Sequence, residues 1–263
     1  MVRPHFIRIT FLQILFCLIV IAAWECAGRE SSRVFFEIGT PLVTLREFFH
    51  LLFQEHLLKH FLITGSEAAV GLIIGTVIGT SAGLSLWYSR SLALAARPFI
   101  VAVATLPIFA FAPLMIVWFG IGWGMKVALA AFSTVFVAFD QAYRGANLTS
   151  SDRIEVLTAM RATPTQIFTK AVVPGAIDWV LSSMRLNVGF GLLGAFIGEF
   201  IAADRGLGYL ILRASGLYNI PRALAAAFGI TVLAFLLNGV AWYIELHRRS
   251  LVQLISVPRI VRR

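Results

Sequence analysis

Six long apolar runs, each free or nearly free of charged residues, constrain this chain more than any other feature. They are Ile9–Trp24, Ala68–Ser89, Pro98–Gly124, Val127–Phe139, Trp179–Gly198 and Ala223–Ile244. A helix that crosses about 30 Å of hydrocarbon needs roughly 20 such residues. The fourth run reaches that length only when Lys126 and Asp140 at its ends are included. We therefore expect an all-α, polytopic membrane protein with six transmembrane helices.

The composition agrees with a membrane protein and excludes an ordinary soluble domain. Of the 263 residues, 59% are hydrophobic and 13% are charged, and the mean hydropathy is +0.86. A net charge of +9 would suggest nucleic-acid binding in a soluble protein. In a membrane protein the positions of the basic residues matter more, because cytoplasmic loops are enriched in Lys and Arg. Basic residues are more numerous in the segments that are cytoplasmic when both termini are, which predicts that orientation in a bacterial inner membrane, with no nucleic-acid partner.

The N-terminal residues 1–27 could instead be a signal peptide, because Arg3 and Arg8 precede an apolar stretch. The stretch is about a full span long, however, and Trp24-Glu25-Cys26 lacks the small residues of a cleavage site. We interpret it as an uncleaved anchor. The expected organisation is an N-terminal transmembrane helix plus an outer amphipathic segment at 1–60, a five-helix core at 61–250 with a cytoplasmic loop at 149–175, and a basic cytoplasmic tail at 251–263.

A strip of small residues marks the second apolar run. Gly71, Gly75, Gly79 and Gly83 recur at every fourth position, so they share one face of a helix. In lipid, small residues let two helix backbones approach closely, and such contacts hold helix bundles together. We expect another helix to pack on this strip, either within the chain or across a dimer.

Two short helices are predicted in the polar stretch between the fourth and fifth runs. Asp152 could cap a first helix at about 153–160, with Glu155 reaching back to the cap. Thr163-Pro164-Thr165-Gln166 predicts the start of a second helix, with Thr163 as the cap and Gln166 as its reciprocal partner. Pro174 should end that helix after two to three turns. Its apolar side is Ile167, Phe168, Ala171 and Val172.

Helices this short are marginal in water unless an apolar face is buried. The bundle of the same chain could bury it, or the second helix could fit a groove on a cytoplasmic partner. Residue 161 should follow the first helix directly, where a left-handed conformation favours glycine. Arg161 must therefore accept some strain or turn the corner in another way.

The stretch resembles the cytoplasmic EAA coupling loop of bacterial ATP-binding cassette (ABC) importer permeases. The family pattern is Glu-Ala-Ala, three residues, Gly-Ala, five residues, Phe and a hydrophobic-Pro close. The chain has Glu155, Arg161-Ala162, Phe168 and Val173-Pro174 at these places. Val156-Leu157 replaces Ala-Ala, and Arg161 replaces the glycine. Two further segments resemble the nitrate/sulfonate/taurine branch of that family: "PLMIVWFGIGWGMKVAL" at Pro113–Leu129 and "SSMRLNVGFGLLGAFIGEFIAADRGLGYLI" at Ser182–Ile211.

The resemblance implies a type I ABC importer permease fold and a subunit without catalytic residues. It implies a cytoplasmic ATPase dimer that binds ATP and Mg²⁺, a periplasmic binding protein, and a second permease copy, as a homodimer in the lipid bilayer. The chain itself has no P-loop motif and would bind no cofactor. The ATPase-coupling residues would be Glu155, Ala159, Arg161, Ala162, Pro164, Phe168 and Pro174.

The solute implied by the resemblance is a small anion such as a sulfonate, nitrate or bicarbonate, although relatives also carry neutral or heterocyclic compounds. A half-buried arginine, hydroxyls and helix N-termini could accommodate an anion. The candidate pathway residues are Thr105, Ser133, Arg185, Asn187 and Glu199. Each could equally make a helix-to-helix hydrogen bond or, for Arg185 and Glu199, anchor the helix at the interface.

Two other classes of function are considered. A secondary transporter driven by an ion gradient would show inverted repeats, broken helices and paired intramembrane charges, and none of these is evident in the sequence. An intramembrane enzyme would need a catalytic constellation within the spans. The spans carry no such set, and no metal site is predicted, since His50, His56 and His60 are better explained as surface residues of the outer segment.

Overall fold

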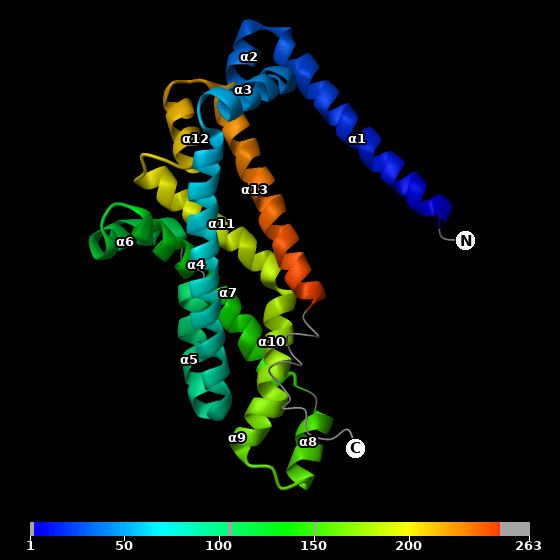
Figure 1. Ribbon diagram of the computed structural model, residues 1–263, viewed down its shortest axis with the longest axis vertical. Coiled ribbons are helices and arrows are strands. Elements are labelled where there is room, and N and C mark those ends of the chain that lie inside the picture. Colours follow the sequence, from blue (N-terminus) through cyan, green and yellow to red (C-terminus); the bar gives the residue numbers. More distant parts are fainter. Residues whose placement is uncertain (1–2, 105–106, 150, 248–263) are drawn as a thin grey trace. The chain divides into compact units, whose positions relative to one another are not determined.

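The computed structural model describes residues 3–104, 107–149 and 151–247. Nearly all of these residues lie in helices and none lies in a strand (Figure 1), which confirms the predicted all-α class. Within this part of the chain, five helices are long and apolar enough to cross a membrane. They are α1 (Arg3–Glu30), α4 (Leu57–Ser85), α7 (Trp123–Asn147), α11 (Met184–Ile201) and α13 (Ile220–Leu246).

The third apolar run is not a single helix, so the prediction of one span at Pro98–Gly124 is wrong. The run is divided between α5 (Arg90–Ala104) and α6 (Ala112–Phe119), with a 3₁₀ turn, η2 (Ile108–Phe111), between them. Pro107 is the N-cap of η2, and a further proline lies in the first turn of α6. Because proline has no N–H and a fixed φ, it interrupts a helical hydrogen-bond ladder. Among the described residues, this run therefore provides two shorter apolar helices and no helix long enough to cross a membrane by itself.

The membrane-crossing helix of the fifth apolar run begins later than predicted. Trp179, its expected first residue, belongs to α10 (Val173–Ser182). The C-cap of α10 is Ser183. Ser183 has φ −92° and ψ 1°, outside regular helical geometry, and α11 starts at the next residue. The membrane-crossing helix is thus shorter than the apolar run in the sequence, because the run continues into the helix before it.

The chain forms two compact units. Unit 1 joins the N-terminal residues up to Phe61 with Arg205–Thr231, and unit 2 joins Leu62–Asp204 with the residues from Val232 on. Unit 1 contains α1, two short helices that follow it, the start of α4, α12 and the start of α13. The additional helices are α2 (Ser32–Ile38), α3 (Pro41–Gln54) and α12 (Leu207–Gly216).

The outer amphipathic segment expected before residue 60 consists of two helices, α2 and α3. Gly39, at φ 63°, ends α2, and Thr40 caps α3 by accepting a hydrogen bond from the N–H of Val43 at 3.3 Å. The apolar side of α3 is largely exposed, with Phe53 at 78%. The Phe48 ring is an exception, since it packs edge-on against Phe228 at 5.1 Å.

Helix α7 is the centre of unit 2, and small residues let its neighbours approach it closely. A side-chain carbon at Gly194 of α11 would lie 2.6 Å from the carbonyl oxygen of Leu129. One at Gly145 of α7 would lie 2.7 Å from Cα of Ala176 in α10. The buried residues Met125 and Leu129 form an apolar core with α6 and α11.

The glycine strip of α4 faces α7 within the same chain. A side-chain carbon at Gly71 would lie 2.9 Å from the amide nitrogen of Ala131, and one at Gly79 would lie 2.9 Å from Cβ of Ala138. The corresponding positions at Gly75 and Gly83 would also meet atoms of α7. No larger side chain fits at these four positions, so the strip sets the distance between the two helices.

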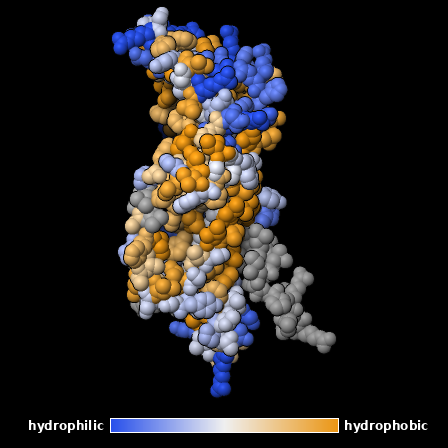
Figure 2. Space-filling model, turned by 90° about the vertical axis from the view of Figure 1, so that its left-hand side faces the viewer, coloured by the Kyte–Doolittle hydropathy of each residue, from blue (hydrophilic) through white to orange (hydrophobic). Residues whose placement is uncertain are grey.

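The surface of unit 2 is apolar over the length of its long helices. Figure 2 shows hydrophobic residues over most of the visible face, with paler and blue residues at the lower end. Figure 1 places α8 (Ser151–Ala159) and α9 (Pro164–Ile167) at that end. The loop in which the sequence predicts two short helices therefore lies at the polar lower end of unit 2.

Candidate functional site

The first helix of the candidate coupling loop is α8, and it ends in a hydrogen-bonded turn. The N–H of Arg161 donates to the carbonyl of Thr158, and the N–H of Ala162 donates to that of Leu157, each at 2.9 Å. This pair of bonds is the Schellman motif, in which one residue is left-handed. That residue is Arg161, with φ 57°, a conformation that costs a residue with a side chain roughly 1 to 2 kcal/mol. The chain thus keeps the left-handed turn and places an arginine in it.

The start of α8 differs from the prediction. The helix begins at Ser151, so Asp152 lies inside its first turn instead of at the cap. The second helix starts where predicted. Thr163 caps α9 by accepting from the N–H of Gln166 at 3.3 Å, and its own N–H donates to Oε1 of Gln166 at 2.8 Å. The predicted capping box is therefore confirmed, with Pro164 at the first helical position.

The second helix does not end at Pro174, so that prediction is wrong. After α9 the chain continues through a π-helical turn, η3 (Phe168–Val172), into α10. The N–H of Val173 donates to the carbonyl of Phe168, five residues earlier. This wider turn stands directly before Pro174, which has no N–H to donate, and Pro174 then occupies the first turn of α10, where none is needed. The loop is thereby continuous with α10.

The apolar side of the second helix packs on its own chain. Val172 and Ala171 are fully buried. The Phe168 ring lies 5.4 Å from the Trp87 ring and 4.7 Å from the Tyr88 ring. Both of these aromatic residues belong to η1 (Leu86–Tyr88), which follows α4. The face expected to enter a partner's groove is therefore occupied within the chain.

The large apolar side chains that the loop leaves exposed lie on α8 and at its end. Val156 and Met160 are four residues apart, so they share one helix face, and they are 59% and 74% exposed. Glu155, Ala159 and Arg161 are exposed beside them, and so is Pro164, while Ala162 is half-buried and Pro174 is buried. An exposed apolar pair flanked by charges suits contact with another protein.

The candidate pathway residues do not form one site. Thr105 lies outside the described residues. Ser133 lines a cavity beside α7. Arg185 donates to Oε2 of Glu245 in α13 at 2.6 Å. Asn187 is buried and donates to Oγ1 of Thr76 at 3.5 Å, and the buried Glu199 accepts from Oγ1 of Thr64 at 2.6 Å. Arg185, Asn187 and Glu199 thus each bond to another helix.

A buried ion pair is missing from the predicted sites. Nζ of Lys126 in α7 lies 2.9 Å from Oε1 of Glu67 in α4. In the sequence, Glu67 directly precedes the second apolar run and Lys126 directly precedes the fourth, and long side chains at the ends of spans usually reach water. The sequence signal for the pair is a negative charge at the start of the second run and a positive charge at the start of the fourth. Their register, which brings them together, is not visible in one sequence.

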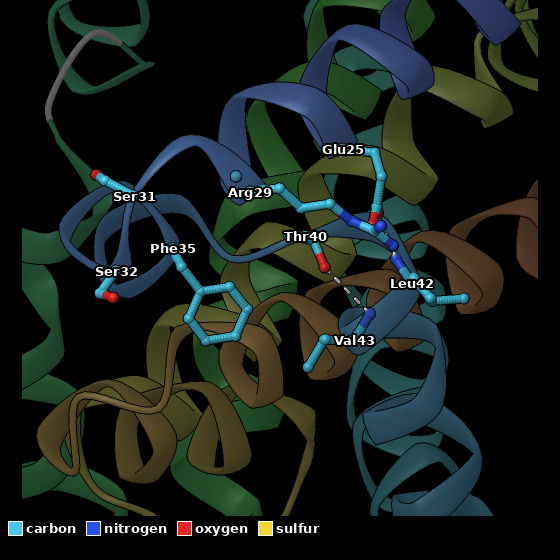
Figure 3. Close-up of a pocket in the computed structure, with 9 residues that line it drawn as sticks. Glu25, Arg29, Ser31, Ser32, Phe35, Thr40, Leu42 and Val43 are labelled. Atoms are coloured by element: carbon cyan, nitrogen blue, oxygen red, sulfur yellow. Dashed lines mark hydrogen bonds and ion pairs between the residues drawn. The ribbon is translucent and has the colours of Figure 1, made fainter.

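A pocket in unit 1 is lined by residues that bond to one another. Figure 3 shows Glu25 and Arg29 side by side at the end of α1, near the start of α3. Glu25 accepts from Arg29 at 2.6 Å and from the N–H of Leu42 at 3.1 Å. Because the Glu25 carboxylate accepts a hydrogen bond from the first turn of α3, the residues that line this pocket have a structural role. The predicted surface residue His60 is likewise engaged, as it accepts from the N–H of Gly206 at 2.9 Å.

Comparisons with known proteins agree on one kind of protein. The family model described as "Binding-protein-dependent transport system inner membrane component" matches residues 75–250, which is more than half of the chain. The formylaminopyrimidine transport permease protein ThiX of Halalkalibacterium halodurans is 28% identical, over 84% of this chain and 88% of that protein. The riboflavin transport system permease protein RibX of Chloroflexus aurantiacus is 29% identical, over 84% of each.

Relatives named for sulfonates and solved structures also match. The putative aliphatic sulfonates transport permease protein SsuC of Bacillus subtilis is 26% identical, over 74% of this chain and 71% of that protein. A structure of the MetNI methionine ABC transporter in an inward-facing conformation matches with a TM-score of 0.63 and 18% identity, over 76% of this chain and 96% of that chain. At that identity the likeness concerns the fold.

Proposed function

We propose, because this chain belongs to the family of binding-protein-dependent transport system inner membrane components, that two copies of it form the solute pathway of an ABC importer. It is a transport permease with the fold of type I ABC importer permeases. As an inner membrane component it is one subunit of a larger machine. The pairing of two identical copies is part of the proposal.

The partner on the cytoplasmic side is an ATPase dimer that hydrolyses ATP with Mg²⁺, while this chain carries out no bond chemistry. An exposed surface on α8 and on the turn after it supports this proposal. Val156 and Met160 present an exposed apolar pair, and Arg161 stands at the turn beside them. Buried apolar side chains at the centre of an interface supply most of its affinity, and a polar rim excludes water. The coupling residues are Glu155, Ala159, Arg161, Ala162, Pro164, Phe168 and Pro174, of which Phe168 and Pro174 act by holding the loop on its own chain.

Closure of the ATPase dimer on ATP would then move the loop and the core together. The loop is continuous with α10, and α10 packs against α7 at Gly145. A pore that changes from 1:99 to 99:1 between two states needs about 5.5 kcal/mol of differential binding. Contacts that the ATPase makes in only one state can supply this free energy.

The orientation follows from the side on which the ATPase binds. The loop and its flanks carry Arg144, Arg153, Arg161 and Lys170. A concentration of basic residues is typical of the cytoplasmic side. We place both termini on that side, and we place the binding-protein contact on the periplasmic side.

The solute is small and is supplied by that binding protein. Relatives bear the names of sulfonates, which are anions, and of formylaminopyrimidine and riboflavin, which are heterocycles. The anion expected from the sequence depends on Arg185 as its basic group. Since Arg185 forms an ion pair with Glu245 at 2.6 Å, that residue gives the expectation little support.

Affinity capture of the ATPase tests the proposal. The membrane fraction is solubilised, the tagged chain is captured, and the co-purifying ATPase activity is measured for the natural chain and for Met160→Asp. A carboxylate at the centre of the α8 contact should lower recovery about tenfold or more. Leu217→Asp is the matched control, because Leu217 is 70% exposed and lies outside the loop. If Met160→Asp and Val156→Asp each recover as much ATPase activity as the natural chain does, α8 is excluded as the contact.

A further inference from the structure

A cavity of about 490 Å³ lies within unit 2, between α7, α11 and the η2 turn. Cavities that bind small molecules have volumes of about 300 to 1,000 Å³. Residues 132, 133, 136, 137, 140 and 141 contribute to it from α7, and residues 186, 190 and 193 from α11. These spacings define one face on each helix. The cavity is therefore built by two membrane-crossing helices and a turn.

The apolar part of the cavity combines three aromatic rings with the aliphatic side chains of Ile108, Val137, Leu186 and Leu193. Phe132 and Phe136 pack edge to face with their centroids 5.2 Å apart, and Phe190 lines the cavity from α11. A further ring, Phe111 of η2, packs against Phe132 with the two ring centroids 4.4 Å apart. Rings held by their neighbours form a firm surface on which a flat ligand can stack.

The polar part of the cavity accepts hydrogen bonds and carries negative charge. Asp140 and Gln141 line it about two helical turns beyond Ser133. Ser133 donates its hydroxyl hydrogen to the carbonyl of Leu129 at 2.7 Å, so its oxygen is left as an acceptor. Arg144 bonds to Oδ2 of Asp140 at 2.7 Å, which leaves the second carboxylate oxygen for another donor.

An anion does not suit these surroundings. Among the described residues, none that lines the cavity is basic. Arg144, the neighbouring cation, is already neutralised by Asp140. A sulfonate or nitrate would lose its hydration beside phenyl rings and a carboxylate, and such a loss is costly without a positive partner.

We propose that this cavity is the solute site of the permease and that it takes a flat, neutral or cationic nitrogen heterocycle with an exocyclic amino group. The ring packs among Phe132, Phe136 and Phe190, parallel to one phenyl ring and edge-on to another, and the amino group donates to Asp140. Gln141 and Ser133 offer further polar contacts along the ring edge. This assignment rests on the proposed transport role and replaces the anion with a heterocycle.

Binding of tritiated adenine to the full-length chain in lipid nanodiscs tests the assignment. We expect saturable binding that unlabelled ethanesulfonate and nitrate, added in large excess, do not displace. Hypoxanthine has a carbonyl in place of the amino group and should bind about tenfold more weakly, because its carbonyl oxygen would face the carboxylate where adenine presents an N–H donor. These comparisons need no variant. Absence of saturable adenine binding, or displacement by ethanesulfonate, overturns the assignment.

Variants locate the site. Asp140→Leu removes both acceptor oxygens and should abolish the preference for adenine over hypoxanthine, and Phe136→Ala should weaken both ligands about tenfold. Arg144→Gln removes the same ion pair but keeps the carboxylate, so it should retain the preference. Phe139→Ala, which alters a ring beside Tyr143 on another face of α7, should leave binding unchanged. A retained preference in Asp140→Leu excludes Asp140 as the acceptor and overturns the assignment.

The same preparations separate this inference from the proposed function. ATPase capture and ATP-driven uptake report on the coupling loop, whereas adenine binding in nanodiscs needs no ATPase. Adenine binding without ATPase capture would refute the importer assembly and leave the site standing. ATPase capture without adenine binding would refute the site and leave the assembly standing.

Discussion

Nζ of Lys126 and Oε1 of Glu67 lie 2.9 Å apart, with side-chain exposures of 5% and 0%. The pair joins α7 to α4 at a depth where neither charge reaches water. On the same side of α4, the hydroxyl of Thr64 donates to Glu199 of α11 at 2.6 Å. Polar contacts therefore tie α4 to both central helices of unit 2. Paired intramembrane charges would also suit an ion-driven carrier, but here the ammonium and one carboxylate oxygen are already bonded to each other.

Removing one member of this pair should destabilise the protein strongly. Lys126→Met, Glu67→Leu or Glu67→Gln alone leaves a buried group without its partner, which costs about 3 to 5 kcal/mol. The double substitution Lys126→Met with Glu67→Leu leaves no unpaired charge and should recover much of that loss. Thermal unfolding of the detergent-solubilised protein, followed by size-exclusion chromatography, measures each step of the cycle.

The exposed pair Arg33–Glu37 provides the control. Its side chains are 87% and 55% exposed, so Glu37→Gln should change stability by less than about 1 kcal/mol. Equal effects of Glu67→Gln and Glu37→Gln would show that the Lys126–Glu67 pair contributes no more than a surface contact.

Close packing of α4 on α7 makes a second prediction. Gly79→Leu places a side chain where Cβ alone would lie 2.9 Å from Cβ of Ala138, so the helices must separate. We expect a loss of about 2 kcal/mol or more, or failure to fold. Gly239→Ala is the control, since no atom lies within 4 Å of its added carbon. It should be neutral or stabilising by up to about 1 kcal/mol. Similar melting temperatures for both variants would contradict the packing role.

The sequence predicts local features of this fold better than the pairing of distant ones. The capping box at Thr163 and the left-handed residue at 161 depend on neighbours within a few positions, and both are present. The glycine strip indicates that a helix packs there but does not identify α7. The Lys126–Glu67 pair depends on the register of two helices, 59 residues apart in sequence.

Apolar composition also cannot distinguish a straight span from a broken one. Residues 98–124 are as apolar as the other runs, and the relevant signals were Pro107 and Pro113. The helical spacing around Phe168 correctly indicated an apolar face, but spacing does not say what covers it. Trp87 and Tyr88, which cover it, precede Phe168 by about 80 residues in the sequence.

Arg185 should be dispensable for transport. It bonds to Glu245 at 2.6 Å, and its side chain is 55% exposed. Because exposed pairs contribute little, Arg185→Gln should change stability by less than about 1 kcal/mol and leave ATP-driven uptake within about twofold. Uptake into proteoliposomes with the ATPase and binding protein measures this. Loss of uptake with normal ATPase capture would return Arg185 to the pathway.

Arg161→Gly should stabilise the coupling loop. Arg161 has φ 57°, where a Cβ is penalised and glycine is not. The gain in the folded state exceeds the entropy that glycine adds to the unfolded chain, so we expect a net gain of about 0.5 to 1 kcal/mol. Hydrogen exchange of the amide of residue 162, which donates to Leu157 at 2.9 Å, should become slower.

Two control variants decide whether left-handed geometry causes that gain. Arg161→Ala keeps a Cβ at the same φ and should not slow the exchange. Arg153→Gly makes the same substitution inside α8, where glycine costs about 1 kcal/mol of helix stability. Hydrogen exchange of the α8 amides should therefore become faster. If Arg161→Ala protected the amide as well as Arg161→Gly does, removal of the long charged side chain would explain the effect. The turn would then carry no strain for glycine to relieve.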